Sequence, residues 1–228
     1  MKKLAIVFCM ILVSANIFAA GKDKKNTTVK GKSVRDQIEL TLTPAIGFSA
    51  SIMPRTGYIS GLGEIKITYS TAQFNLGFNA TMIGFPYKRM FEHEWKVIKN
   101  LTTILNMDIG LSGKLSVKTE NGSVSYKPKK ALTFYFQALE GYTFKPVKNL
   151  YITPAIGLGF GRAEFITDSA FIGYLDSIFS VPVYASIKYF FTDLIGIEGA
   201  VLNSFGFGTA IGGFANTFIL KAGTVFKF

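Results

Sequence analysis

The feature that most constrains this chain is a period-two alternation of apolar side chains, which recurs along most of its length. Between Ile38 and Ile52 every second residue is apolar, and the residues between them are polar or small. Successive side chains of a β-strand point to opposite faces, so this spacing predicts a strand with one apolar face. Although 49% of the chain is hydrophobic, no apolar run after the first twenty residues approaches the length of about 20 that a spanning helix needs.

The same alternation predicts ten strands in all. They are expected near residues 38–52, 58–69, 74–82, 90–97, 105–117, 131–145, 150–161, 179–189, 195–201 and 217–228. Turn-forming residues at 54–57 and 70–72 separate the first three. The segment 90–97 fits a helix in a loop nearly as well. The alternative is eight strands, in which residues 85–130 form one large loop with its own hairpin.

Strict alternation through the predicted strand 131–145 sends Glu140 to the apolar face. A carboxylate on a lipid-facing surface costs up to a few kcal/mol near mid-membrane and less near an interface. A β-bulge at residues 138–140 would turn Glu140 away, and it is the expected arrangement here.

The closing segment, residues 217–228, has an uncharged face that ends on Phe226 and Phe228, and an opposite face that carries Lys221 and Lys227. It resembles the last strand of bacterial outer-membrane β-barrels, whose terminal Phe is presented to the barrel-assembly machinery. The resemblance is to the class of OmpA-transmembrane and OmpW-like barrels. It implies an all-β fold, a closed antiparallel transmembrane up-and-down barrel, with Phe226 and Phe228 as the assembly signal. Closure would satisfy every backbone group that lipid cannot.

Residues 1–20 have the form of a secretory signal peptide, with Lys2 and Lys3 before an apolar run and small residues after it. The only cysteine, Cys9, lies inside this segment. Residues 21–36 are basic and without aromatic side chains, which predicts a flexible leader. The barrel would occupy residues 37–228. An exported chain rarely meets nucleic acid, so nucleic acid is not expected as a partner. The basic residues of 21–36 would contact anionic lipid headgroups or cell-wall polymer, and the barrel itself would contact outer-membrane lipids.

The inward faces of the predicted strands carry acids and lysines in nearly equal number. The predicted lumen charge network comprises Glu39, Glu64, Lys66, Glu92, Glu94, Lys96, Asp108, Lys114, Lys188, Glu198 and Lys221. One hypothesis is an ion-pair network that holds a filled barrel rigid. The other is a narrow polar pore or a gate made by the same charges.

The only histidine, His93, stands between Glu92 and Glu94, and no serine nucleophile motif accompanies it. One histidine with two glutamates falls short of a typical metal site, so neither a metal nor a cofactor is expected. The favoured function is a non-enzymatic barrel with a structural or surface-interaction role through its outer loops, where an extracellular or host ligand would bind. The alternatives are a narrow channel for small or apolar solutes and an outer-membrane lipid or peptide hydrolase that uses His93.

Overall fold

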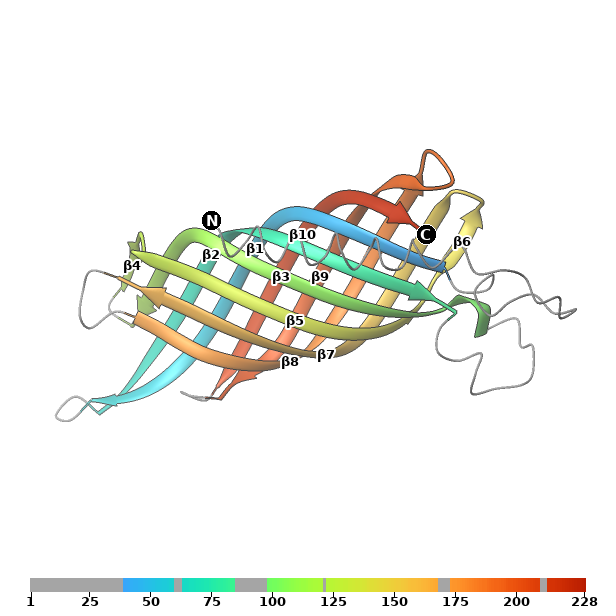
Figure 1. Ribbon diagram of the computed structural model, residues 1–228. Coiled ribbons are helices and arrows are strands. Elements are labelled where there is room, and N and C mark those ends of the chain that lie inside the picture. The colour runs from blue at the N-terminus through green and yellow to red at the C-terminus, as the bar shows by residue number, and fades with distance from the viewer. Residues whose placement is uncertain (1–38, 60–62, 85–97, 121, 168–172, 210–212) are drawn as a thin grey trace, which may run out of the picture.

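The computed structural model describes residues 39–59, 63–84, 98–120, 122–167, 173–209 and 213–228. In this part of the chain the structure is all-β apart from one short 3-10 turn, η2 (Ile98–Asn100) (Figure 1). The strands are β1 (Glu39–Ile59), β2 (Gly63–Ile83), β3 (Leu101–Thr119), β4 (Gly122–Tyr126), β5 (Lys130–Tyr142), β6 (Phe144–Val147), β7 (Leu150–Ile166), β8 (Gly173–Phe190), β9 (Ile195–Gly208) and β10 (Phe214–Lys227). No described helix is long and apolar enough to cross a membrane.

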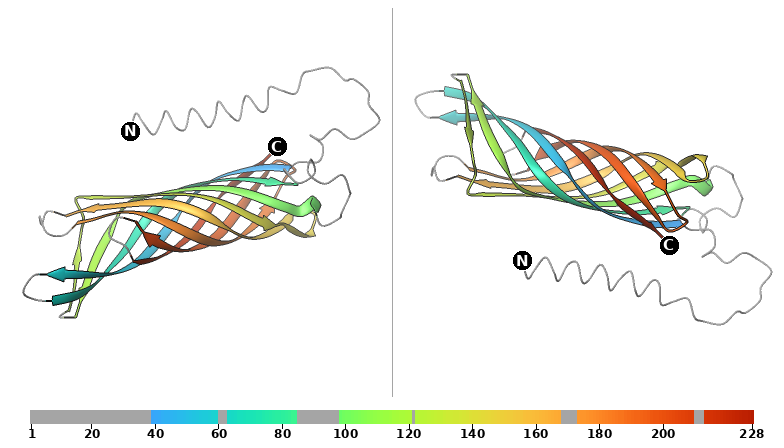
Figure 2. Two further views of the ribbon diagram at one scale, coloured as in Figure 1. Left: turned by 90° about the horizontal axis from the view of Figure 1, so that it is seen from below. Right: turned by 90° about the horizontal axis from the view of Figure 1, so that it is seen from above.

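The strands form a closed antiparallel barrel, in which eight lines of strand make up the wall. The order around the wall is β2-β1-β10-β9-β8-β7-β5-β3, and the pairing of β3 with β2 closes it. The short β6 continues the line of β5 and pairs with β7, whereas β4 pairs with β3 as a side hairpin. We call the end where β1 begins and β10 stops the terminal end, and the opposite end the distal end (Figure 2).

The predicted count of ten strands is therefore corrected to eight. Residues 54–57 and 70–72, predicted as turns, lie inside β1 and β2, which pair without a break from Glu39 opposite Ile83 to Ile59 opposite Gly63. Pro54 is tolerated because β1 pairs with β10 only as far as Ile52, so it lies where that edge of β1 has no described partner strand. The strand predicted at 90–97 lies outside the described residues.

The eight-strand alternative predicted the correct number of strands but assigned the wrong segments to the wall. It placed residues 85–130 in one loop, whereas β3 is a full wall strand that pairs with β2 on one side and with β5 on the other. Only the β3–β4 hairpin corresponds to the hairpin expected within that loop.

The outer wall is apolar, as the alternation predicts. In β1, β8, β9 and β10 the predicted apolar faces are the exposed ones, and a belt of large apolar side chains surrounds the barrel. The belt includes Ile46, Phe48, Ile52, Phe74, Leu105, Phe136, Ile156, Leu158, Phe160, Phe179, Val181, Val183, Ile187, Ile197, Phe205, Phe207, Phe218 and Leu220. A soluble protein rarely exposes so large a continuous apolar surface, which indicates contact with lipid.

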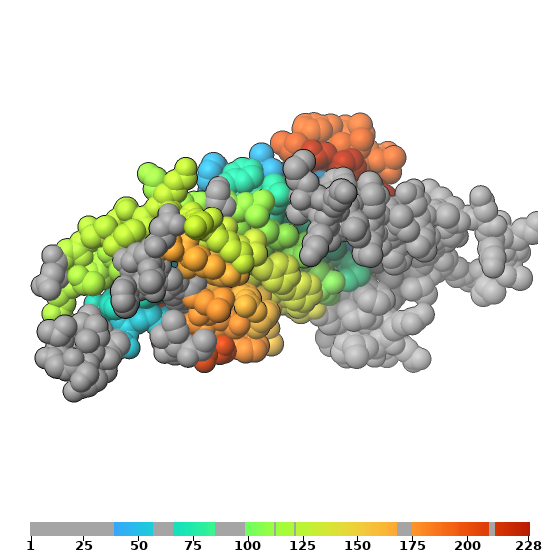
Figure 3. Space-filling view, turned by 60° about the vertical axis from the view of Figure 1, so that its left-hand side comes forward, coloured from blue at the N-terminus to red at the C-terminus, as the bar shows by residue number. Residues whose placement is uncertain are grey.

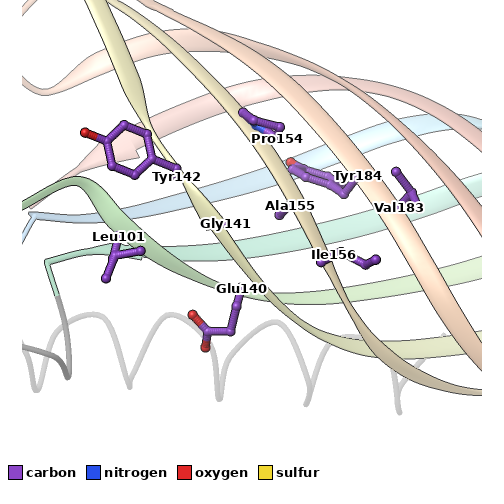
Figure 4. Close-up of a pocket in the computed structure, with 9 residues that line it drawn as sticks. All are labelled: Leu101, Glu140, Gly141, Tyr142, Pro154, Ala155, Ile156, Val183 and Tyr184. Carbon is purple, nitrogen blue, oxygen red and sulfur yellow. The ribbon is translucent and has the colours of Figure 1, made fainter. Parts of the chain in front are cut away.

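Glu140 does face outward, and the bulge predicted at 138–140 is absent, because β5 pairs regularly with both β3 and β7 there. The carboxylate instead accepts hydrogen bonds from Thr103 Oγ1 at 3.0 and 3.1 Å. It borders a shallow groove in the outer wall near the terminal end, with Tyr142, Pro154 and Ile156 among the lining residues (Figure 4). A position near the interface and a hydroxyl partner reduce the cost of this charge.

The bulge lies in β3 instead, where Ser112 is the extra residue. Leu111 pairs with Phe74 and Gly113 with Gln73, so one residue of β3 has no partner on β2. Gly113 has a φ of +152°, and a Cβ at this position would collide with the carbonyl oxygen of Ala72. The bulge changes the inward positions of β3 from even-numbered to odd-numbered residues. Leu115, predicted to face lipid, is consequently fully buried inside the barrel.

Candidate functional site: the filled lumen

The centre of the lumen is organised around Lys221 of β10. Its Nζ donates to Asp108 Oδ1 at 2.9 Å, to Asn79 Oδ1 at 2.9 Å and to Asn106 Oδ1. Asn106 in turn donates to Asp108 Oδ2 at 2.6 Å and to Gln137 Oε1 at 2.5 Å. The lysine and aspartate side chains are only 2% and 0% exposed, so this is a desolvated ion pair whose charges are held by hydrogen bonds.

A second cluster lies next to the first and shares Asn79 with it. Tyr184 OH donates to Glu198 Oε1 at 2.6 Å, and Asn79 Nδ2 donates to the same oxygen at 3.2 Å. Lys188 Nζ lies 3.9 Å from Glu198 Oε2 and donates to Thr41 Oγ1 and Thr81 Oγ1, both at 2.8 Å. The Lys221–Asp108 pair joins β10 with β3, which are not neighbours in the wall. Lys188 and Glu198 face each other on the neighbouring strands β8 and β9, and their cluster reaches β1 and β2 through Thr41, Thr81 and Asn79.

A third cluster closes the terminal end. Glu39 forms ion pairs with Lys145 at 2.7 Å and with Lys227 at 3.0 Å. Lys227 also donates to Tyr151 OH at 2.8 Å, and the Nζ of Lys145 lies 4.4 Å from the centre of the Tyr151 ring. These side chains are partly exposed, so each pair contributes less than it would in the interior.

The distal half of the lumen is filled by apolar side chains. Met53, Leu115, Ala163, Phe165, Ile178 and Ala215 form one buried cluster, against which Tyr69, Val117 and Ala131 pack. Arg55 and Asp176 form a buried ion pair of 3.1 Å among the distal residues. Arg55 Nη1 also donates to the carbonyl oxygens of Pro54 and Phe214, at 2.9 and 2.7 Å.

The structure brings some of the predicted charge network together and separates the rest. Inside the lumen or at its terminal rim lie Glu39, Asp108, Lys188, Glu198 and Lys221. The inward placement of Lys66 and Lys114 is corrected, because both side chains are exposed on the outer face. The predicted turn at 70–72 misassigned the faces of the preceding strand, and the Ser112 bulge inverted those of β3. Glu92, Glu94, Lys96 and His93 lie outside the described residues, as does the side chain of Glu64.

Phe226 and Phe228, the predicted assembly signal, are exposed on the outer wall at the terminal end. The neutral members of the network, Asn79, Asn106 and Tyr184, were not singled out from the sequence. Their signal was present, because each is a polar residue in the inward register of its strand. Arg55 and Asp176 were missed because Arg55 was assigned to the turn 54–57, and Asp176 falls between the predicted strands 150–161 and 179–189.

The arrangement pairs the charges that it buries. Each buried charge described above is paired, and the described residues include no group of three or more histidines, cysteines and acids placed to bind a metal ion. An eight-stranded barrel is just wide enough for side chains to fill its interior. Within the described residues, ion pairs and hydrogen bonds therefore cross the lumen between strands of the wall.

Comparison with known proteins agrees with this architecture. The family described as "Domain of unknown function (DUF2715)" matches residues 36–228. No curated protein sequence matches the chain. The crystal structure of Neisserial surface protein A is similar over 84% of this chain and 97% of its own, with 13% identity and a TM-score of 0.50. OprG from Pseudomonas aeruginosa covers 83% of this chain and 95% of its own, at 11% identity and a TM-score of 0.49. The likeness to the Neisserial protein shows that the fold is that of the small outer-membrane β-barrels.

Proposed function

We propose that this chain, which belongs to the family of unknown function DUF2715, is an integral outer-membrane barrel with an occluded lumen and a non-enzymatic, structural or surface-interaction role. The observation that carries the proposal is that the inward side chains of the described residues are buried in clusters along the barrel. The polar clusters around Lys221 and Lys188 occupy its centre, and the apolar cluster around Met53 and Phe165 occupies its distal half. A solute would have to displace both.

The apolar belt supports insertion in a lipid bilayer, because eight closed strands satisfy their backbone groups within the wall. Export by residues 1–20 and delivery by the barrel-assembly machinery through Phe226 and Phe228 are parts of the same proposal. The connections at 148–149 and 191–194 of the terminal end are short, as periplasmic turns are in this class of barrel. The distal end would then face outward and carry the surface role.

The test is conductance in planar bilayers, made on protein whose folding is verified by a heat-dependent shift in gel mobility. Wild-type protein is expected to give no steady conductance steps. The double variant Met53→Gly/Phe165→Gly removes the two large side chains of the apolar cluster and is expected to raise leakage through the barrel. Val124→Gly, in the exposed side hairpin, serves as the control and should remain silent.

Steady conductance by the wild-type protein would overturn the occluded-lumen proposal and favour a narrow channel. Hydrolysis is tested separately with His93→Ala. An activity toward lipid or peptide substrates that is present in wild-type protein and absent in this variant would overturn the non-enzymatic role.

A further inference from the structure

The outer faces of β2 and β3 change character at the Ser112 bulge. On its terminal side the outward residues Phe74 and Leu111 face each other across the two strands and belong to the apolar wall. On its distal side the outward positions carry Lys66, Lys114 and Lys118, all exposed. We call these three residues the lysine row.

The lysine row is held on one continuous sheet. Lys114 pairs with Ala72, and Lys118 pairs with Thr68, which places Lys66 diagonally next to Lys118. The outward residues of β3 and β4 between them are hydroxylic, and Ser116 Oγ lies 2.8 Å from Ser125 Oγ. This part of β1, β2, β3 and β4 projects at the distal end, where the space-filling view shows the yellow-green hairpin forming part of the outer surface (Figure 3).

The inward face of this projecting sheet packs against the distal apolar cluster, which anchors the sheet to the barrel. Leu115 is fully buried in the distal apolar cluster, and Val117 and Tyr69 pack against the same cluster. The bulge therefore directs the apolar side chains of β3 inward and its lysines outward at the same point along the strand. Lys114 is the first outward residue of β3 after the bulge, and Leu111 is the last outward apolar residue before it.

Lysines outnumber acids along the row in the described structure. Glu120 is exposed and is the next outward residue after Lys118, on the side of Lys66, so the described row has three lysines against one acid. Glu164 is paired with Lys130 at 2.8 Å. The outward positions of β2 between Lys66 and Phe74 are Thr68, Ser70 and Ala72, which carry no charge. The row is thus a net cationic strip that begins where the apolar wall stops.

Building on the membrane insertion proposed above, we propose that the lysine row binds the phosphate groups of anionic lipid headgroups in the leaflet at the distal end. Lysine side chains bury their methylene stems against apolar surface while the ammonium group reaches the headgroup layer. An ammonium group forms charge-assisted hydrogen bonds with phosphate oxygens. Continuity with the apolar wall favours a lipid over a soluble polyanion, because the first lysine is the next outward residue of β3 after Leu111 of that wall.

The experiment is native mass spectrometry of the folded protein, released from micelles that contain equal amounts of phosphatidylglycerol and phosphatidylcholine. The readout is the ratio of the two lipids retained on the barrel. The test variant is Lys114→Gln/Lys118→Gln, and the control is Lys99→Gln/Lys148→Gln, which removes the same charge from exposed sites near the terminal end. Lys66→Gln provides a second, single-site variant of the row.

Wild-type protein and the control are expected to retain phosphatidylglycerol preferentially. In the test variant, the ratio of retained phosphatidylglycerol to phosphatidylcholine is expected to be about tenfold lower. An unchanged lipid ratio in the test variant, or an equal fall of this ratio in the control, would overturn the proposal that the lysine row binds anionic headgroups. Binding of dextran sulfate that depends on the row, without a preference for phosphatidylglycerol, would also overturn it in favour of a soluble polyanion. A wild-type chain without a heat-dependent mobility shift would refute the membrane barrel itself.

Discussion

At the scale of single residues, the lumen is built from charges that are costly to bury and are therefore paired. Lys221 and Asp108 are the most enclosed pair, with two asparagines completing the coordination of the ammonium group. Arg55 and Asp176 form a similar buried pair among the distal residues. Such pairs add little net stability relative to apolar side chains of the same volume, but removal of one partner leaves the other uncompensated.

Replacement of Lys221 with Met should destabilise the barrel by about 3–5 kcal/mol, because Asp108 would be left as an unpaired buried charge. The measurement is the urea midpoint of unfolding from detergent micelles. Lys148→Met, at an exposed site, should change the midpoint little. Adding Asp108→Asn to Lys221→Met should recover part of the loss, and a full loss retained in the double variant would contradict this account.

Replacement of Gly208 with Ala should disturb the buried Arg55–Asp176 pair. An added Cβ would collide with Asp176 Oδ2 and lie 2.7 Å from Arg55 Nη2. The expected loss is about 1–3 kcal/mol of unfolding free energy, as for other overpacked sites. Gly199→Ala on the same strand is the matched control, since an added Cβ there would have no neighbour within 4 Å. Equal midpoints for the two variants would refute the steric explanation.

At the scale of elements, the bulge in β3 decides which face of the distal sheet is apolar. Because the bulge adds one residue, the outward set changes from Leu105, Met107, Ile109 and Leu111 to Lys114, Ser116 and Lys118. Period-two alternation continues through the sequence on both sides, so the strand pattern by itself contains no sign of the change. The bulge is seen only in the pairing with β2, where the register shifts between Gln73 and Phe74.

Deletion of Ser112 should be tolerated, since it removes the unpaired residue and leaves the pairs Leu111–Phe74 and Gly113–Gln73 adjacent. The barrel should remain heat-modifiable, and a cysteine at position 114 should still react with an impermeant maleimide while one at 115 stays protected. Deletion of Met107 is the contrasting change. It would turn Asp108 outward and Ile109 inward, and it should prevent a heat-modifiable barrel from forming. A similar outcome for both deletions would contradict the assigned bulge.

At the scale of the whole molecule, the barrel combines three kinds of packing along its axis. Partly exposed ion pairs close the terminal end, a buried polar network fills the middle, and an apolar cluster fills the distal half. The apolar wall surrounds all of this. The distal parts of β1, β2, β3 and β4 project at one end of the barrel (Figure 1), and Lys66, Lys114 and Lys118 are exposed on their outer face. These two features, the packed lumen and the projecting sheet, are the basis of the proposed role in contact rather than in transport.

Deletion of Phe228 should reduce the amount of barrel assembled in cells while leaving refolding into detergent micelles nearly unchanged. The backbone N–H of Phe228 donates to the carbonyl oxygen of Leu40 at 2.9 Å, but its side chain is half exposed on the outer wall and contributes little to the core. The measurement compares heat-modifiable protein in the outer-membrane fraction with the yield of refolding in vitro. Parallel losses in both assays would assign Phe228 a structural role instead of a signal.

The sequence alone determined the all-β class and the outward faces of β1, β8, β9 and β10, because alternation is a local property of each strand. Five of the predicted inward charges, Glu39, Asp108, Lys188, Glu198 and Lys221, also lie inside or at the rim for this reason. Closure into a barrel was implied by the resemblance of residues 217–228 to the last strand of outer-membrane barrels. The number of strands, the bulge at Ser112 and the partners of each buried charge were decided by the tertiary structure. Each of these depends on the register between strands distant in sequence, which no single strand encodes.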